Sequence, residues 1–387
     1  MRITGYAYPW DVLDDPDFAR RAVDLGVEEV AVALAYHSAR AATPHSPHGT
    51  SVLARHAALY RPVREEAWRE AALRPAAPDW VRGPDSGGEA LRLLAGSGLR
   101  TAAWLVLTHN SLLGNAHPDC TVTNCFGEHY PWALCPAEPR VRAYAATLTA
   151  ESLRGTRPDT VVLEACGPLG AVHQHQHEKT DAVWSPAVQR LLSVCCCPSC
   201  ARAWSAAGLD PQEVRARLRA ETHRLLHDED LTTEADALPE ELRRLLLTTR
   251  QSATDRLRHA VLEAVPTGVR RVLHASPDPW ATGALPGLTP AAAEDVDAVV
   301  APAWVPGAES VRTAARARAL LPERVALGSY VTAVAPAPVP AEHIPGLARA
   351  GAAELHLYHL GLAGPARRPD LRTACEAARK AGGGDGG

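Results

Sequence analysis

The sequence predicts an α/β fold of the (β/α)8 TIM-barrel type for this chain of 387 residues. Short apolar runs alternate along the chain with longer amphipathic stretches, which is the pattern of parallel strands joined by helices. We count eight such apolar runs, and eight βα units are what a closed barrel needs. No Gly-x-Gly-x-x-Gly motif follows the first run, so a doubly wound dinucleotide-binding sheet is disfavoured.

The predicted strands have apolar bodies and the short length that a barrel needs. We expect them at residues 3–8, 29–36, 100–107, 160–165, 270–275, 298–304, 324–330 and 354–358. The amphipathic stretches that follow most of them predict helices at residues 16–25, 88–95, 139–153, 240–265, 308–320, 341–350 and 369–380.

Three connections are too long to be ordinary loops, namely residues 38–87, 108–138 and 166–239. Each follows a predicted strand, so in a barrel all three lie on the face that carries the active site. The longest contains a charged helical stretch at residues 211–227. We therefore expect a single domain over residues 1–381 with three insertions, and a disordered glycine-rich tail at residues 382–387.

The composition fits a globular protein and argues against two classes of partner. Hydrophobic residues make up 46% of the chain, which is ample for a core, and the formal net charge of -4 comes without a Lys/Arg run, so nucleic acid is not an expected partner. The N-terminus lacks the basic start and apolar stretch of an export signal, and no apolar run reaches membrane-spanning length. We expect a cytoplasmic protein with no membrane partner, monomeric or homo-oligomeric, whose nine cysteines are reduced and available for metal.

The predicted strands end in polar and aromatic residues. In a barrel these ends meet at one mouth, where aromatic faces stack on sugars and polar groups satisfy sugar hydroxyls. The mouth therefore suits a polyhydroxylated ligand, although the aromatic residues could instead only plug the barrel. The candidate substrate-binding residues at these ends are Tyr8, His37, His109, Asn110, His274, Trp304, Tyr330 and His359.

Glu164 is the sharpest candidate for catalysis. It ends the apolar run Val161-Val162-Leu163, and an acid at such a position is rarely buried without a partner or a role. Burial would favour its protonated form, which suits a general acid. The alternative is a structural ion pair with an arginine.

A histidine-rich segment follows Glu164. His173, His175 and His177 alternate with glutamines, so they share one side of an extended chain. His175 and His177 could line the substrate cleft, and all three could bind a metal. Glu178 comes next and is our candidate for a second catalytic carboxylate. The alternative is a polar loop held together by its own hydrogen bonds.

Cys195, Cys197 and Cys200 predict a metal site. Their Cys-x-Cys-x-x-Cys spacing brings three thiolates within reach of one tetrahedral ion, and a fourth ligand is then expected from elsewhere in the chain. The alternative is a group of buried cysteines that hold no metal.

Three motifs in this order resemble the clan A glycoside hydrolases, in particular the zinc-containing β-galactosidases of family 42. They are a Cys-Pro segment at Cys135, Glu164 at the end of the fourth predicted strand, and the Cys-x-Cys-x-x-Cys that follows, together covering roughly residues 100–205. The resemblance implies an acid/base role for Glu164. It also implies a structural Zn²⁺ held by Cys135 with Cys195, Cys197 and Cys200, because four thiolates leave no place for a reacting water.

Two positions depart from that family's pattern. Leu163 stands before Glu164, where the family has Asn, and the seventh predicted strand ends in Tyr330 without the Glu that serves as nucleophile. An inverting mechanism needs no such nucleophile, since two carboxylates at a wider separation activate a water, and Glu164 with Glu178 could form that pair.

The sequence therefore predicts a glycoside hydrolase-like enzyme that acts on a sugar or a glycosylated small molecule, with Glu164 and Glu178 as catalytic groups. Two alternatives stay open. One is a non-catalytic carbohydrate-binding barrel, since the strand-seven Glu is absent. The other is a lyase or a metal-dependent hydrolase that uses His173, His175 and His177 on the same scaffold.

Overall fold

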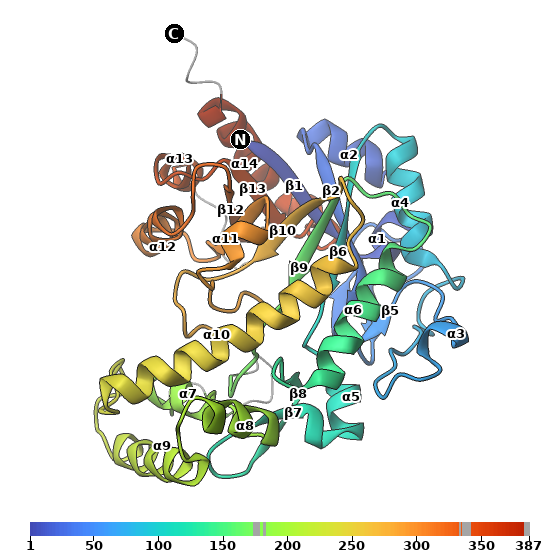
Figure 1. The fold of residues 1–387 in the computed structure, drawn as a ribbon. Coiled ribbons are helices and arrows are strands. Elements are labelled where there is room, and N and C mark those ends of the chain that lie inside the picture. Colours follow the sequence, from blue (N-terminus) through green and yellow to red (C-terminus); the bar gives the residue numbers. More distant parts are fainter. Residues whose placement is uncertain (173–178, 181–182, 333, 335–341, 383–387) are drawn as a thin grey trace.

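The chain forms a closed barrel of eight parallel strands surrounded by helices, which confirms the predicted fold class (Figure 1). The barrel closes because β1 pairs with β2 on one side and with β13 on the other. The strands, in order round the barrel, are β1 (Arg2–Ala7), β2 (Glu29–Tyr36), β6 (Arg100–Val106), β9 (Thr160–Glu164), β10 (Arg270–His274), β11 (Ala298–Pro302), β12 (Ala326–Thr332) and β13 (Glu354–Tyr358). The computed structural model describes residues 1–172, 179–180, 183–332, 334 and 342–382.

Side chains of each strand point in turn to the barrel axis and to the surrounding helices. In β2, Val32 and Leu34 belong to the apolar core between strands and helices, whereas Ala33 belongs to the cluster at the axis. Both faces of the strand are buried, which is why such strands read as continuous apolar runs. By the same alternation, Glu164 shares the axial face of β9 with Val162.

Helices cover the barrel where the amphipathic stretches predict them. They are α2 (Phe18–Leu25), α4 (Ser86–Gly96), α6 (Pro139–Leu153), α10 (Glu240–Glu263), α12 (Ala308–Ala319), α13 (His343–Arg349) and α14 (Arg368–Gly382). The crossover between β10 and β11 contains only the single turn α11 (Ala292–Asp295). Helix α10, with 24 residues, begins beside the insertions that follow β6 and β9 and runs from there to the barrel wall (Figure 1).

The predicted strand ends need small corrections. The seventh strand was expected from residue 324, but β12 begins at Ala326 because Val325 donates its backbone N–H to Pro322 in a turn. The sixth strand ends at Pro302, so Trp304 lies just beyond it in the loop. These shifts leave the predicted strand order unchanged.

The insertion after β2 contains short strands and a short helix that we did not predict from the sequence. A hairpin forms from β3 (Ala39–Ala42) and β4 (Ser51–Ala54), and β5 (Ala58–Leu59) pairs antiparallel with the end of β2. Helix α3 (Glu65–Trp68) follows. Between β1 and α2, the short helix α1 (Pro9–Leu13) begins with a proline at its first turn, where a missing N–H costs nothing.

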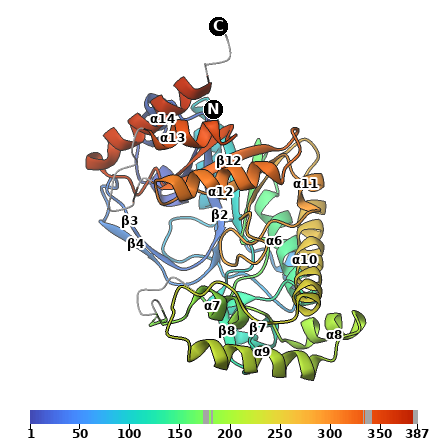
Figure 2. The same cartoon turned by 90° about the vertical axis from the view of Figure 1, so that its left-hand side faces the viewer.

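The insertions after β6 and β9 lie together at one end of the molecule in both views (Figures 1 and 2). The first contains α5 (Ser111–Ala116), η1 (Pro118–Cys120) and the hairpin of β7 (Thr121–Thr123) with β8 (His129–Leu134). The second contains α7 (Pro186–Leu192), α8 (Pro198–Ala206) and α9 (Pro211–Leu226). Helix α9 matches the charged stretch predicted at residues 211–227.

The C-terminal helix α14 follows η2 (Pro365–Arg367) and includes Gly382. Gly382 is the first residue of the tail that we expected to be disordered, and residues 383–387 lie outside the described part of the chain. None of the described helices is both long enough and apolar enough to cross a membrane.

Candidate functional site

Glu164 is the last residue of β9, and its carboxylate is buried at the barrel axis, with 5% of the residue exposed. Trp104 Nε1 donates a hydrogen bond of 2.9 Å to Glu164 Oε2. His274 Nδ1 lies 3.3 Å from the same oxygen. No arginine among the described residues pairs with Glu164, so its partners are an indole and an imidazole and not the guanidinium of a structural ion pair.

The chain turns sharply just after Glu164. Ala165 has φ 51°, the only positive φ of a described residue other than glycine, and this left-handed conformation is costly for a residue with a Cβ. Its backbone is held on both sides, since its N–H donates to Ala284 and its carbonyl accepts from the Thr108 hydroxyl at 2.8 Å. The turn lets β9 end at the carboxylate and the long insertion begin.

Three tyrosine hydroxyls meet in the mouth of the barrel. Tyr8 Oη lies 3.4 Å from Tyr36 Oη and 3.3 Å from Tyr358 Oη. Burial raises the pKa of each of these phenols, so all three stay protonated. Tyr8 donates to Tyr36, which leaves the Tyr36 proton for a ligand. Tyr8, Tyr36 and Tyr358 each end a predicted strand, and Tyr8 is the one that we named as a substrate-binding candidate.

Trp304 and Tyr330 form an aromatic wall beside this group. The Trp304 ring stacks on Tyr358 at 5.2 Å and meets Tyr330 edge-on at 5.4 Å, and 38% of Trp304 is exposed. Tyr330 is buried, and its hydroxyl has no hydrogen-bond partner among the described residues. A buried hydroxyl without a partner is costly, and a polar ligand in the mouth could satisfy it.

His37 and His109 stack on one another at 4.3 Å, and His37 also stacks on Tyr36 at 4.2 Å. His37 Nδ1 lies 2.7 Å from the Ser38 carbonyl, and burial lowers its pKa, so the ring is neutral. Both histidines are half-buried, and their stacked rings lie just beyond the ends of β2 and β6.

Asn110 has a structural role that its sequence position did not reveal. Its Oδ1 accepts from the backbone N–H of Leu113 and so caps α5, and its Nδ2 donates to Tyr144 at 3.3 Å. Both ends of the amide are therefore engaged within the protein, and we do not retain Asn110 among the substrate-binding candidates.

His359 is buried just beyond β13, with its ring 4.4 Å from that of Tyr8. Its Nδ1 accepts from the Gly361 N–H at 3.2 Å and lies 3.7 Å from Asp11 Oδ2. This bond places the ring proton on Nε2, which has no partner among the described residues. Burial lowers the pKa of His359 to about 3, so it is a neutral donor.

Sequence reasoning missed Trp104 and Asp11. Trp104 lies inside an apolar strand, where a tryptophan reads as core. Asp11 is buried in α1 and accepts from the Tyr8 N–H at 2.9 Å, and burial raises its pKa to about 8. The only signal for it was an acid two residues after Pro9 in an otherwise apolar stretch. The predicted residues His173, His175, His177 and Glu178 lie outside the described part of the chain.

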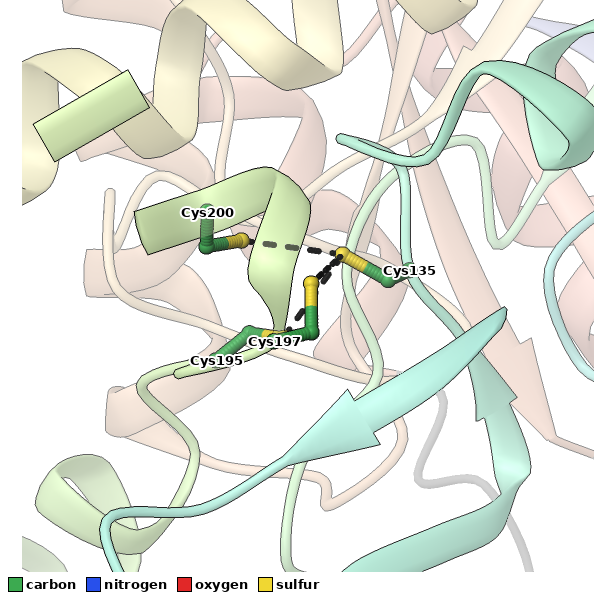
Figure 3. A group of neighbouring side chains, drawn as sticks. All are labelled: Cys135, Cys195, Cys197 and Cys200. Atoms are coloured by element: carbon green, nitrogen blue, oxygen red, sulfur yellow. Dashed lines mark hydrogen bonds between the residues drawn. The ribbon is translucent and has the colours of Figure 1, made fainter. Parts of the chain in front are cut away.

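Cys135, Cys195, Cys197 and Cys200 come together between the two insertions, with their sulfur atoms directed toward one another (Figure 3). The Cys135 Sγ lies 3.6 Å from those of Cys195 and Cys197 and 3.7 Å from that of Cys200. A tetrahedral ion with Zn–S bonds of about 2.3 Å needs sulfur atoms about 3.8 Å apart. The four cysteines are thus close enough to bind one metal ion.

Local structure explains how the cysteines converge. Pro198 starts α8 directly after Cys197, which turns Cys200 back toward the preceding cysteines. Cys196 donates its backbone N–H to Thr123 in β7, and its thiol contacts the Val194 carbonyl and not the cluster. The Cys196 thiol therefore points away from the cluster.

An arginine lies next to the cysteine cluster. Arg250 of α10 donates to the carbonyls of Ser193, Trp280 and Ala281. Burial lowers the pKa of Arg250 to about 10, and Asp278 and the nearby cysteines act against this effect. A tetrathiolate site with a divalent ion carries a net negative charge, which this guanidinium would offset.

The chain is similar in fold to solved glycoside hydrolases. The glycoside hydrolase domain of PgaB (BpsB) from Bordetella bronchiseptica is 17% identical, with a TM-score of 0.58 over 97% of this chain and 99% of that one. The catalytic domain of β-amylase from Paenibacillus polymyxa is 11% identical, with a TM-score of 0.56 over 98% of both chains. The family 42 β-galactosidase Gan42B from G. stearothermophilus is 11% identical, with a TM-score of 0.55 over 98% of this chain and 55% of that one.

No protein-family model matches the chain, and no curated protein matches it in sequence. The structural likenesses lie at low sequence identity, so they show a shared architecture. This chain has the (β/α)8 barrel that these glycoside hydrolases use.

Proposed function

We propose that the protein is a glycoside hydrolase-like enzyme in which Glu164 is the general acid/base. The observation that carries the proposal is a buried carboxylate at the end of the fourth barrel strand, held through one oxygen by Trp104 and His274. Both polar contacts fall on Oε2, and among the described residues no hydrogen bond or ion pair reaches Oε1. That oxygen is the one we assign to the glycosidic bond.

The surrounding residues suit a sugar. Trp304 offers an exposed face for stacking, and Tyr330 and His359 each offer a buried polar atom without a described partner. His37, His109 and Tyr8 complete the proposed subsites. His274 lies behind the carboxylate, so we assign it to positioning Glu164 and not to contact with the substrate.

The second catalytic group remains Glu178 in this proposal, assisted by His175 and His177 at the substrate. The seventh barrel strand, β12, contains no Asp or Glu, and we therefore assign no retaining nucleophile to this strand. An inverting pair of Glu164 with a carboxylate from the following insertion needs no residue there, since water attacks from the opposite face of the ring.

We further propose that the four clustered cysteines hold a structural zinc ion. The sulfur separations match a tetrahedral site, and four thiolates close the coordination sphere. Bound there, the ion would stabilise the fold and take no part in the reaction. Its role would be to fasten the insertion after β6 to the insertion after β9.

The test compares Glu164→Gln with wild type on a panel of 4-nitrophenyl glycosides and unsubstituted oligosaccharides. General acid catalysis contributes about 10²–10⁴-fold, so we expect kcat to fall by that factor on oligosaccharides. Glu151→Gln is the matched control, because Glu151 is also buried but pairs with Arg64 on the outside of the barrel. Turnover by Glu164→Gln at the wild-type rate would refute the assignment.

A non-catalytic carbohydrate-binding protein is the second candidate, and the acid-free β12 favours it. Such a protein would bind a sugar from the same panel in calorimetry and leave it intact on prolonged incubation. The lyase and metal-dependent hydrolase alternatives depend on the segment 173–178, and no described contact supports them.

A further inference from the structure

A continuous line of buried polar side chains runs through the centre of the barrel, from Glu164 toward the opposite end. His274 Nδ1 lies 3.3 Å from Glu164 Oε2, and His274 Nε2 lies 2.7 Å from Tyr6 Oη. Tyr6 Oη is also 3.0 Å from His356 Nδ1, and His356 Nε2 is 3.2 Å from Glu354 Oε2. All five residues are at most 5% exposed. A barrel held by packing alone would need none of these groups.

The strands explain why these residues meet. They come from β9, β10, β1 and β13, and each lies on the axial face of its strand. Glu354 is the first residue of β13, whereas Glu164 and His274 are the last residues of their strands. Because all the strands are parallel, the line therefore extends from the mouth to the base of the barrel. There Arg270 pairs with Glu354.

Tyr6 fixes the direction of the hydrogen bonds, since its single hydroxyl proton lies between two imidazoles. When Tyr6 donates to His356, it must accept from the Nε2–H of His274. His274 then presents a lone pair on Nδ1, and this atom can form a hydrogen bond with Glu164 only if the carboxyl is protonated. In that arrangement His356 carries its proton on Nε2 and donates to Glu354.

A second arrangement uses the same number of protons. The Glu164 proton passes to His274 Nδ1, the Nε2 proton of His274 passes to the Tyr6 oxygen, and the Tyr6 proton passes to His356 Nδ1. Glu164 is then a carboxylate, and His356 is an imidazolium beside the Glu354 carboxylate. No bond other than these N–H and O–H bonds changes, and no outside acid or base takes part.

We propose that Glu164, His274, Tyr6, His356 and Glu354 form a proton relay that takes up the proton of Glu164 when it acts as a base and returns it when it acts as an acid. The relay rests on the catalytic role proposed for Glu164. In it, His274, Tyr6, His356 and Glu354 are positioning residues that act through Glu164 and do not touch the substrate.

The ends of the line suit this role. Burial would raise the pKa of Glu354, but its contacts with His356 and Arg270 outweigh burial and lower the pKa to about 2. Glu354 therefore stays ionised and attracts an imidazolium at His356. Burial lowers the pKa of His274, so that ring is neutral, as both arrangements require.

The link from Glu164 to His274 is the loosest of the line, because Nδ1 makes no well-aligned hydrogen bond in this arrangement. Polar groups of other strands face the line, and the phenols of Tyr36 and Tyr358 lie near Glu164. Trp104 of β6 holds Glu164, and the Tyr330 ring of β12 lies 4.7 Å from that of His274. Glu29 of β2 lies near Tyr6.

Glu29 has partners of its own. Its carboxylate accepts from the hydroxyls of Thr4 and Thr160, and Arg2 and Arg100 lie within 4.0 Å of it. Among the described residues, no hydrogen bond or ion pair joins Glu29 to a relay residue. Protons therefore pass only along the line between Glu164 and Glu354, with no branch to Glu29.

Nitrogen NMR of the histidine rings tests the relay without a substrate. In protein labelled with ¹⁵N histidine, the chemical shift of each ring nitrogen reports whether that atom carries a proton. His274 and His356 are assigned from the signals lost in His274→Asn and His356→Asn. In wild type we expect the fraction of His274 that carries its proton on Nδ1 to equal the fraction of His356 that carries two protons, because the protons of the line move together.

In Glu164→Gln the doubly protonated fraction of His356 should disappear, although the two side chains do not touch, because the line has lost the proton of Glu164. Tyr6→Phe should also remove this fraction, since it removes the connecting hydroxyl. Tyr60→Phe replaces a buried tyrosine whose hydroxyl accepts a hydrogen bond from Trp80; it is the control and should leave the protonation of both histidines as in wild type. The same protonation of His356 in wild type, Glu164→Gln and Tyr6→Phe would overturn the relay.

Kinetics supply a separate readout. On glycosides with poor leaving groups, Tyr6→Phe should lower kcat by about 10–100-fold, the lower part of the range for acid/base catalysis. On dinitrophenyl glycosides, whose leaving group needs little protonation, it should change kcat little. An equal loss on both substrate classes would mean that Tyr6 only supports the fold. Wild-type protein that turns over no glycoside would defeat the proposed function, whereas the NMR result would still decide the relay.

Discussion

Trp104 Nε1 donates to Glu164 Oε2 at 2.9 Å across the inside of the barrel, between residues 60 positions apart in the chain. The bond joins two adjacent strands, since β6 pairs with β9 and Trp104 lies opposite Val162 in that register. It leaves one carboxylate oxygen committed to the protein, and no described hydrogen bond or ion pair reaches the other. The orientation of the proposed acid therefore depends on a residue that reads in the sequence as ordinary core.

Trp104→Phe keeps an aromatic ring and removes the indole N–H. Leaving a buried hydrogen-bond acceptor without its donor costs about 1–3 kcal/mol, so the free energy of unfolding should fall by that amount beyond the loss of packing. The packing loss is measured with Trp68→Phe, because Trp68 is also buried and its Nε1 has no described partner. Urea denaturation at neutral pH gives both values, and equal losses in the two variants would contradict the expected role of the bond.

Removal of the proposed zinc ligands should remove the metal. We expect one zinc ion per chain in wild type by mass spectrometry of the metal content, and less than one in Cys135→Ser and Cys200→Ser, with a lower Tm in both. Cys196→Ser is the matched control from the same run, because its thiol faces away from the cluster. Full zinc content in Cys135→Ser would exclude the tetrathiolate site.

Asp11 should make the fold less stable as pH rises. Its pKa is about 8 in the folded chain against an ordinary value of 3.8, so between these values the unfolded chain binds fewer protons than the folded one. The free energy of unfolding then falls with rising pH, by up to about 1.4 kcal/mol per pH unit. Asp11→Asn should remove this slope and be more stable than wild type at pH 8. A variant whose stability relative to wild type is the same at pH 5 and pH 8 would show that Asp11 is already ionised.

Trp304→Ala should weaken sugar binding with little effect on stability, because 38% of the residue is exposed. An aromatic stacking contact contributes about 0.5–1.5 kcal/mol, so Kd should rise roughly two- to tenfold for whichever sugar of the panel binds. Isothermal titration calorimetry measures this, with Val305→Ala as the neighbouring control, since Val305 is 75% exposed. Unchanged affinity in Trp304→Ala would place the sugar elsewhere.

The barrel was predictable because parallel strands are buried on both faces. That burial requires continuous apolar runs such as Val30 to Ala35, and eight of them appear along the chain. The short elements of the insertions were not predictable in the same way. The hairpin of β3 and β4 has neither a strong alternation nor a dominant turn motif, and its pairing depends on contacts with the rest of the fold.

The site was predictable where chemistry and position coincide. Glu164 and the Cys-x-Cys-x-x-Cys run stand out because an acid at a strand end and closely spaced thiols are unusual. Tyr6 reads in the sequence as one more aromatic residue near a strand end, and His356 as an isolated polar residue in a short strand, so neither predicts that the two meet. Their contact arises from strands at opposite ends of the chain, which only the closure of β1 against β13 brings together.

The position of the cysteine cluster along the chain has a consequence for Glu164. The backbone leaves the cluster at Cys135, forms α6 and β9, and returns to it at Cys195. A metal ion at the cluster would close this stretch into a loop that contains Glu164, and closing a loop reduces the freedom of the unfolded chain. Glu164 would then be fixed in two ways. Trp104 holds its carboxylate oxygen, and the metal ion would hold the backbone on both sides of it, at Cys135 and Cys195.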